Sequence, residues 1–435
     1  MSSTAPAPAL FGLLLLSLSA PDARALQASS PGALPFAARH SASWSGPAPA
    51  LLGPAPATRP SLAPRPGTLP ASSPLHSAAR PAGDLLFVGS SILGPEDPAW
   101  LFDVARDRKV WSATQAETNN VTGGAFADEG RELYLAGGDS AVATLTRGDL
   151  SGFHPTWSVV YDPLGSGPFD VHADEARRLL YVLAHPVPGP ESALLAIDID
   201  PTHPTYLQVV ATTHNLTANP IVERFALSSG GDRAAVLSAL VRHLHVVDTD
   251  PASTTYMQVL YQGPVPVSGP YPIVTSAAVT SDESQVIVAI QRGGGAPSAI
   301  ARFDLATLSW MDHNPHLPGI QNIGPDSAPP AGLGAAVFDV DVAGDDTFVV
   351  ACGWGGAGWA GRLDLDPTIP PLWSWTAYAP PQGLADAWAL DLAADDQLVA
   401  IETEGRVLVL RADTGAVVRS FPLAQTSNIY LVRQG

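Results

Sequence analysis

Short apolar stretches alternate with polar turns along residues 83–435. In each unit an apolar stretch leads into an acidic turn, and a second apolar stretch follows directly. The turns contain Asp128, Asp174, Asp232, Asp282, Asp345 and Asp395. Stretches this short, rich in Val, Leu and aromatic residues and bounded by turn residues, predict β-strands rather than helices.

The unit repeats at a length that suits four strands. Successive acidic turns lie 46, 58, 50, 63 and 50 residues apart, and a third and a fourth apolar stretch follow the first two. Ile197–Val210 and Val247–Leu260 are identical at seven of fourteen positions. One four-stranded unit cannot bury both faces of its sheet, so the units must stack. This pattern predicts the blades of a β-propeller.

The two ends of the repeat region predict the number of blades. Six units are complete; Leu85–Val88, Trp100–Phe102 and Val110–Trp111 precede them, and Asn428–Arg433 follows. Three strands at one end and one at the other make a seventh blade, closed by pairing of the N- and C-terminal strands. The prediction is an all-β, seven-bladed β-propeller. A β-helix, the alternative, has shorter rungs and would not divide a unit between the two ends.

The residues before the repeats predict an exported protein. The apolar run Leu10–Ala20 is too short to span a bilayer, and Ala23-Arg24-Ala25 follows it. This layout predicts a signal peptide over residues 1–25 and a secreted or periplasmic location, and the absence of a following Cys argues against a lipoprotein. Residues 26–82 are rich in Pro, Ala and Ser and predict a disordered linker. The propeller domain is then 83–435.

Charge and cysteine content exclude several classes of partner and scaffold. The single cysteine, Cys352, excludes a disulfide within the chain. The formal net charge is −19, and residues 83–435 carry nearly all the acidic residues. So acidic a domain repels phosphate backbones and anionic lipid, so we expect neither nucleic-acid binding nor membrane insertion. A monomer with a protein or carbohydrate ligand fits this composition.

The repeat resembles the YVTN and quinoprotein-like propellers of bacteria. The similarity lies in an acidic turn before a Leu-Tyr-Val-type strand, as in residues 174–182, and in strands that end Asp-x-x-Thr, as in residues 304–307. The Trp-Asp and Gly-His pairs of WD repeats are missing. The family includes binding proteins and some enzymes, so the resemblance implies architecture rather than chemistry.

The longer loops are expected on one face, which is where function usually resides on a rigid scaffold. Trp354 and Trp359, in a glycine-rich loop, could form a stacking platform for a sugar, or could instead cover the ends of neighbouring blades. His313, His316 and Arg292 in other loops of this face are further candidate ligand-binding residues.

Three carboxylates suggest a second candidate site. Asp170, Asp341 and Asp391 each lie four residues before an acidic turn, on the strand expected to be innermost, and His172 is nearby. Carboxylates that converge at the axis could hold Ca²⁺. The alternative is that each accepts hydrogen bonds from backbone amides within its own blade. A repeated Asp-x-Asp-Pro, as at Asp198 and Asp248, is interpreted as turn chemistry.

No catalytic motif of the common enzyme families occurs in the sequence. The first hypothesis is therefore a non-enzymatic binding or scaffold propeller that acts through its long-loop face. The second is a metal-dependent, lactonase-like hydrolase with the axial carboxylates as metal ligands.

We expect the exported chain to begin at Leu26, because small residues at 23 and 25 precede it. N-terminal sequencing of protein recovered outside the cytoplasm measures this directly. Recovery of exported protein that retains Met1 would show that the segment is not cleaved.

Overall fold

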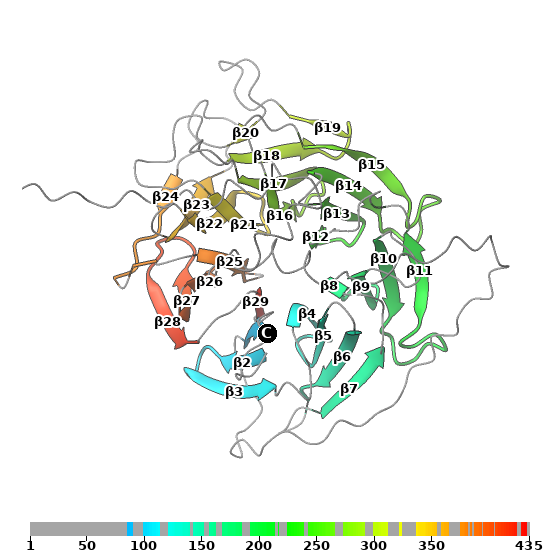
Figure 1. The fold of residues 1–435 in the computed structure, drawn as a ribbon, viewed down its shortest axis with the longest axis horizontal. Coiled ribbons are helices and arrows are strands. Elements are labelled where there is room, and N and C mark those ends of the chain that lie inside the picture. Colours follow the sequence, from blue (N-terminus) through cyan, green and yellow to red (C-terminus); the bar gives the residue numbers. More distant parts are fainter. Residues whose placement is uncertain are drawn as a thin grey trace, which may run out of the picture.

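The computed structural model describes most of residues 85–432 as seven antiparallel sheets arranged around one axis (Figure 1). Outside the described residues lie 1–84, 433–435 and the following connecting segments: 90–98, 114–120, 140–141, 152–155, 162–167, 185–191, 214–215, 217–223, 239–241, 266–272, 292–298, 312–321, 324–335, 355–357, 365–374, 382, 385–386, 394, 404 and 424–427. The predicted signal peptide and linker thus lie outside them. Within the described residues, no helix is long and apolar enough to cross a membrane.

Each blade is a meander of four strands, written here from the innermost to the outermost. Blade 1 has β29 (Asn428–Val432), β1 (Leu85–Gly89), β2 (Ala99–Asp103) and β3 (Arg108–Ala113). Blade 2 has β4 (Val121–Ala127), β5 (Glu132–Asp139), β6 (Val142–Asp149) and β7 (Thr156–Tyr161). Blade 3 has β8 (Pro168–Asp174), β9 (Leu179–Ala184), β10 (Ala193–Asp198) and β11 (Val209–Thr213). Blade 4 has β12 (Arg224–Leu227), β13 (Arg233–Ser238), β14 (His243–Asp248) and β15 (Val259–Pro264).

The remaining three blades follow the same order. Blade 5 has β16 (Ile273–Val279), β17 (Gln285–Gln291), β18 (Ala299–Asp304) and β19 (Ser309–Trp310), with β20 (Asn322–Ile323) also paired to β18. Blade 6 has β21 (Ala336–Val342), β22 (Phe348–Trp354), β23 (Gly358–Asp364) and β24 (Trp375–Ala377). Blade 7 has β25 (Ala387–Leu392), β26 (Leu398–Thr403), β27 (Arg406–Arg411) and β28 (Val417–Pro422).

The predicted fold is confirmed, including the divided blade. The last strand, β29, pairs antiparallel with β1, so that Leu86 lies opposite Leu431 and Val88 opposite Ile429. The chain thus closes its ring by backbone hydrogen bonds between its first and last strands. Blade 7 adds to this closure from outside, where Arg419 donates from Nε to the carbonyl of Val104 in blade 1 at 3.0 Å.

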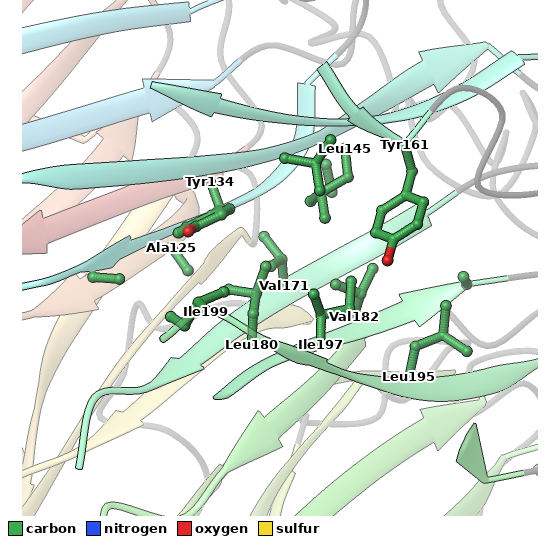
Figure 2. Close-up of a cluster of buried hydrophobic side chains, with 14 of the residues drawn as sticks. Ala125, Tyr134, Leu145, Tyr161, Val171, Leu180, Val182, Leu195, Ile197 and Ile199 are labelled. Atoms are coloured by element: carbon green, nitrogen blue, oxygen red, sulfur yellow. The ribbon is translucent and has the colours of Figure 1, made fainter. Parts of the chain in front are cut away.

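The hydrophobic core is divided among the seven interfaces between blades. Alternate residues of one strand serve different interfaces, since successive side chains of a β-strand point to opposite faces. In β9, Leu180 and Val182 pack towards blade 2, whereas Tyr181 and Leu183 pack towards blade 4. Figure 2 shows the cluster between blades 2 and 3, in which Tyr134 meets side chains of blade 3. Both faces of each inner sheet are buried as a result.

Carboxylates also connect neighbouring blades at the tight turns between first and second strands. Asp346, in the left-handed region at φ 59°, accepts hydrogen bonds from the backbone N–H of Ser281 at 2.7 Å and of Asp282 at 2.9 Å in blade 5. Asp396, also at positive φ, accepts from Gly344 of blade 6 at 2.8 Å. The acidic turns recognised in the sequence therefore join blades as well as ending strands.

The repeated Asp-x-Asp-Pro segments form turns, as interpreted from the sequence. Asp198 accepts from the N–H of Asp200 at 2.9 Å, and Asp200 accepts from that of Thr202 at 2.8 Å. Asp248 accepts from the N–H of Asp250 at 3.2 Å in the next blade.

Deleting residues 427–435 should destabilise the whole ring by several kcal/mol, because β1 loses its inner partner and apolar surface of the adjoining blades is uncovered. Chemical denaturation of the intact and truncated proteins measures the loss. Removal of nine residues from segment 26–82 is the matched control and should leave stability unchanged. A truncated protein as stable as the intact one would contradict the role of β29 in closure.

Candidate functional site

Polar side chains gather on the innermost strands of three blades. We call Asp170 and His172 of β8, Arg224 of β12, and Asp339 and Asp341 of β21 the axial cluster. These strands surround the axis of the ring in Figure 1. Blades 3 and 4 thus face blade 6 across the axis, so the cluster depends on ring closure.

Asp170 joins blade 3 to blade 4 and holds a histidine. Its Oδ1 accepts from the N–H of Val171 at 3.0 Å, and its Oδ2 accepts from the N–H of Phe225 in β12 at 3.3 Å. His172 Nε2 lies 3.5 Å from Oδ2, and its ring meets that of Phe225 edge-on with centroids 4.5 Å apart. Carboxylate and phenyl ring together fix the orientation of the imidazole.

Asp339 plays the corresponding part between blades 6 and 7. Its Oδ1 accepts from the N–H of Val340 at 3.1 Å, and its Oδ2 accepts from that of Leu390 in β25 at 3.0 Å. Arg224 lies 3.7 Å from the same Oδ2, and the Ser276 hydroxyl donates to the carboxyl group. Burial raises the pKa of Asp339, and the Arg224 guanidinium opposes that rise.

Asp341 differs from Asp170 and Asp339 because its side chain is partly exposed although its carboxyl group is desolvated. Its carboxyl oxygens accept from the N–H of Val342 at 2.8 Å and of Leu392 in β25 at 3.0 Å. Desolvation raises its pKa to about 6, although the hydrogen bonds from these two backbone amides lower it. The charge of Asp339 adds to the rise, whereas His172 opposes it. The imidazole is therefore near enough to affect the charge of this carboxyl.

The exposed fractions of the side chains divide the cluster into buried carboxylates and partly exposed groups. The side chains of Asp170 and Asp339 are 8% and 7% exposed, whereas those of His172 and Arg224 are 31% and 24% exposed. Asp341 is also partly accessible. Two buried carboxylates thus hold a partly exposed imidazole and a partly exposed guanidinium, in the same cluster as a carboxyl whose pKa desolvation raises to about 6.

The strand register corrects one sequence inference. A β-bulge precedes Asp170 in β8, and the same bulge precedes Asp339 in β21. Asp170 is therefore equivalent to Asp339, whereas Asp341 is equivalent to His172 and Asp391. Equivalence of Asp170, Asp341 and Asp391 was wrong because Asp174 ends β8 itself, whereas Asp345 lies beyond the end of β21.

The amide contacts bear on the proposed calcium site. Both oxygens of Asp170 and of Asp341 accept from backbone N–H groups, one in their own blade and one in the next. Within the part of the chain that the structure describes, no group of three His, Cys, Asp or Glu side chains is placed to hold a metal ion. Asp391 is half-buried on β25. A calcium site here stays a prediction.

The loop-face candidates fall mostly outside the described residues. Arg292, His313 and His316 lie there, and so does the side chain of Trp354, whose backbone ends β22. Trp359 is described: it is 8% exposed and packs in the cluster between blades 5 and 6. That is the position expected of a ring covering neighbouring blades. The stacking platform stays a prediction.

Arg224 and Asp339 were not expected from the sequence to be members of the cluster. The two-residue period of β-strands places Asp339 on the same side of β21 as Asp341, and this signal could have identified it. No pattern within one blade relates Arg224 to a carboxylate of blade 6.

Replacing Asp339 by Ala should lower the free energy of unfolding by about 2–4 kcal/mol, because Arg224 and the Leu390 amide lose their shared acceptor. The matched control is Asp345→Ala, an exposed residue of the same blade whose described contacts are within its own turn, with a loss below about 1 kcal/mol. Urea denaturation measures both. Equal losses in the two variants would contradict an interblade role for Asp339.

Comparison with known proteins identifies the fold. No family model matches the sequence, and no curated protein is similar to it at the sequence level. A solved candidate 6-phosphogluconolactonase of Bacteroides fragilis aligns with a TM-score of 0.58 and 11% identity, over 82% of this chain and 99% of that one. The periplasmic gluconolactonase of Pseudomonas aeruginosa aligns with a TM-score of 0.58 and 14% identity, over 81% of this chain and 100% of that one.

A Lactobacillus plantarum protein aligns with a TM-score of 0.56 and 13% identity, over 80% of this chain and 99% of that one. At such identities the likeness concerns the fold alone. The chain has the β-propeller fold of these bacterial proteins, as the resemblance in its repeats implied.

Proposed function

We propose that the axial cluster is the active site of a hydrolase that opens small cyclic esters. The proposal rests on the position and the acidity of Asp341. This partly accessible carboxyl lies in the same cluster as an imidazole held by a carboxylate, and desolvation raises its pKa to about 6. A general acid is most effective when its pKa lies near the working pH. An Asp in an ordinary surface position ionises near pH 4 and would be a poor acid at neutrality.

In this mechanism His172 acts as the general base. Its Nε2 faces Asp170, which leaves Nδ1 to take a proton from the attacking water. The Asp170 carboxylate favours the tautomer with the proton on Nε2 and stabilises the imidazolium that forms, as the third group does in hydrolytic triads. The water oxygen then bonds to the ester carbonyl carbon.

Arg224 and Asp341 would complete the reaction. The guanidinium of Arg224, oriented by Asp339, offers N–H donors to the negative charge that develops on the carbonyl oxygen. The ring C–O bond breaks, and the leaving oxygen takes its proton from Asp341. The product is a hydroxy acid. His172 then releases its proton to the surrounding water and Asp341 takes one up from it, which restores both groups for the next turnover.

Two of the aligned structures carry names that agree with this chemistry, a candidate 6-phosphogluconolactonase and a gluconolactonase. The second is named as periplasmic, which supports the exported location expected from residues 1–25. This proposal replaces the metal-dependent version of the lactonase hypothesis, because the carboxylate oxygens bind backbone amides. It also favours the axis over the loop face as the site of function.

Asp341→Asn should lower kcat for hydrolysis of an aldonolactone by about 10²–10⁴-fold, because the amide cannot donate the proton. In the unmodified protein, kcat/KM should fall as the pH rises through about 6, since a carboxyl with a raised pKa loses its proton there. Acid release, corrected for spontaneous hydrolysis, measures both.

Asp391→Asn is the matched control, since Asp391 occupies the equivalent position on β25 and has no part in the mechanism. It should keep its activity and its pH profile. Hydrolysis no faster than the spontaneous rate, or an Asp341→Asn variant with full activity, would contradict the proposal.

A further inference from the structure

We propose that the axial cluster accepts uncharged lactones and rejects those that bear a phosphate group. This inference rests on the proposed function and adds the substrate class. It follows from the charges that the fold brings to the axis and from their pairing.

Acidic groups outnumber basic ones on the innermost strands. β8, β21 and β25 contribute Asp170, Asp339, Asp341 and Asp391 at the level of the cluster. The other innermost strands, β4, β16 and β29, contribute no charged residue. Within the described bounds of these seven strands, Arg224 of β12 is the one arginine or lysine. A molecule at this site therefore meets a negative field.

The charge of Arg224 is already opposed. Its guanidinium lies 3.7 Å from Asp339, which is buried and also accepts from Leu390 and Ser276. A phosphate monoester carries nearly two negative charges at neutral pH. Proteins bind it with several hydrogen-bond donors that are not already paired with a carboxylate, usually including Arg or Lys. The chain has a single lysine, Lys109, and it lies on β3, the outermost strand of blade 1.

Burial strengthens the discrimination. Asp170 and Asp339 are surrounded by protein rather than by water, so salt ions screen their charges less than those of surface groups. An uncharged sugar lactone does not meet this repulsion.

The test compares an aldonolactone with its phosphate monoester as substrates of the full-length protein. We expect kcat/KM for the phosphorylated lactone to be at least tenfold lower at 20 mM salt, and the difference to narrow at 500 mM salt. Asp339→Asn should narrow it at low salt as well, because Arg224 then loses the opposing charge of Asp339. Asp345→Asn, on the exposed turn of the same blade, should leave the ratio unchanged. Equal or faster hydrolysis of the phosphorylated lactone at low salt would overturn the inference while leaving the proposed function standing.

A binding measurement separates the two claims. Saturation-transfer NMR with glucose and glucose 6-phosphate needs no turnover and reads charge selection alone. Stronger contact with the uncharged sugar supports the inference even if no lactone is hydrolysed, in which case the proposed function is wrong. Stronger contact with the phosphate overturns the inference whatever the activity.

Discussion

The free edge of each innermost strand is the constraint on which the rest of this propeller depends. Such a strand pairs with its blade on one side only, so the backbone N–H groups of its other edge need acceptors. In this chain, side chains of the preceding blade supply them. Asp170 accepts from Phe225, Asp339 from Leu390, and Asp341 from Leu392, each across a blade boundary.

The same requirement creates the candidate site. A carboxylate that reaches a backbone amide near the axis is taken out of water, and this raises the free energy of its charged form. The positive charge of Arg224 opposes the effect of burial on Asp339, and Asp170 lies beside His172. Asp341 keeps partial access, and desolvation raises its pKa to about 6. Asp341 therefore both joins two blades and has a pKa near neutrality.

The sequence predicts the fold well because the blade is a local unit. Apolar alternation, turn residues and the divided seventh blade all lie within short stretches, and the structure confirms them. The axial cluster is harder to predict because its members meet only when the ring closes. Arg224 and Asp339 are 115 positions apart in the chain, and no local pattern relates them. The equivalence of Asp170 and Asp341 failed for a related reason, since counting from acidic turns ignores where each strand ends.

The place of Asp341 at the axis raises the pKa of its carboxyl group to about 6. A ¹³C NMR titration of the aspartate carboxyl signals, with Asp341 assigned through the Asp341→Asn variant, tests it most directly. We expect a midpoint near pH 6 for Asp341. A midpoint near 4, the ordinary value for an aspartate, would contradict it.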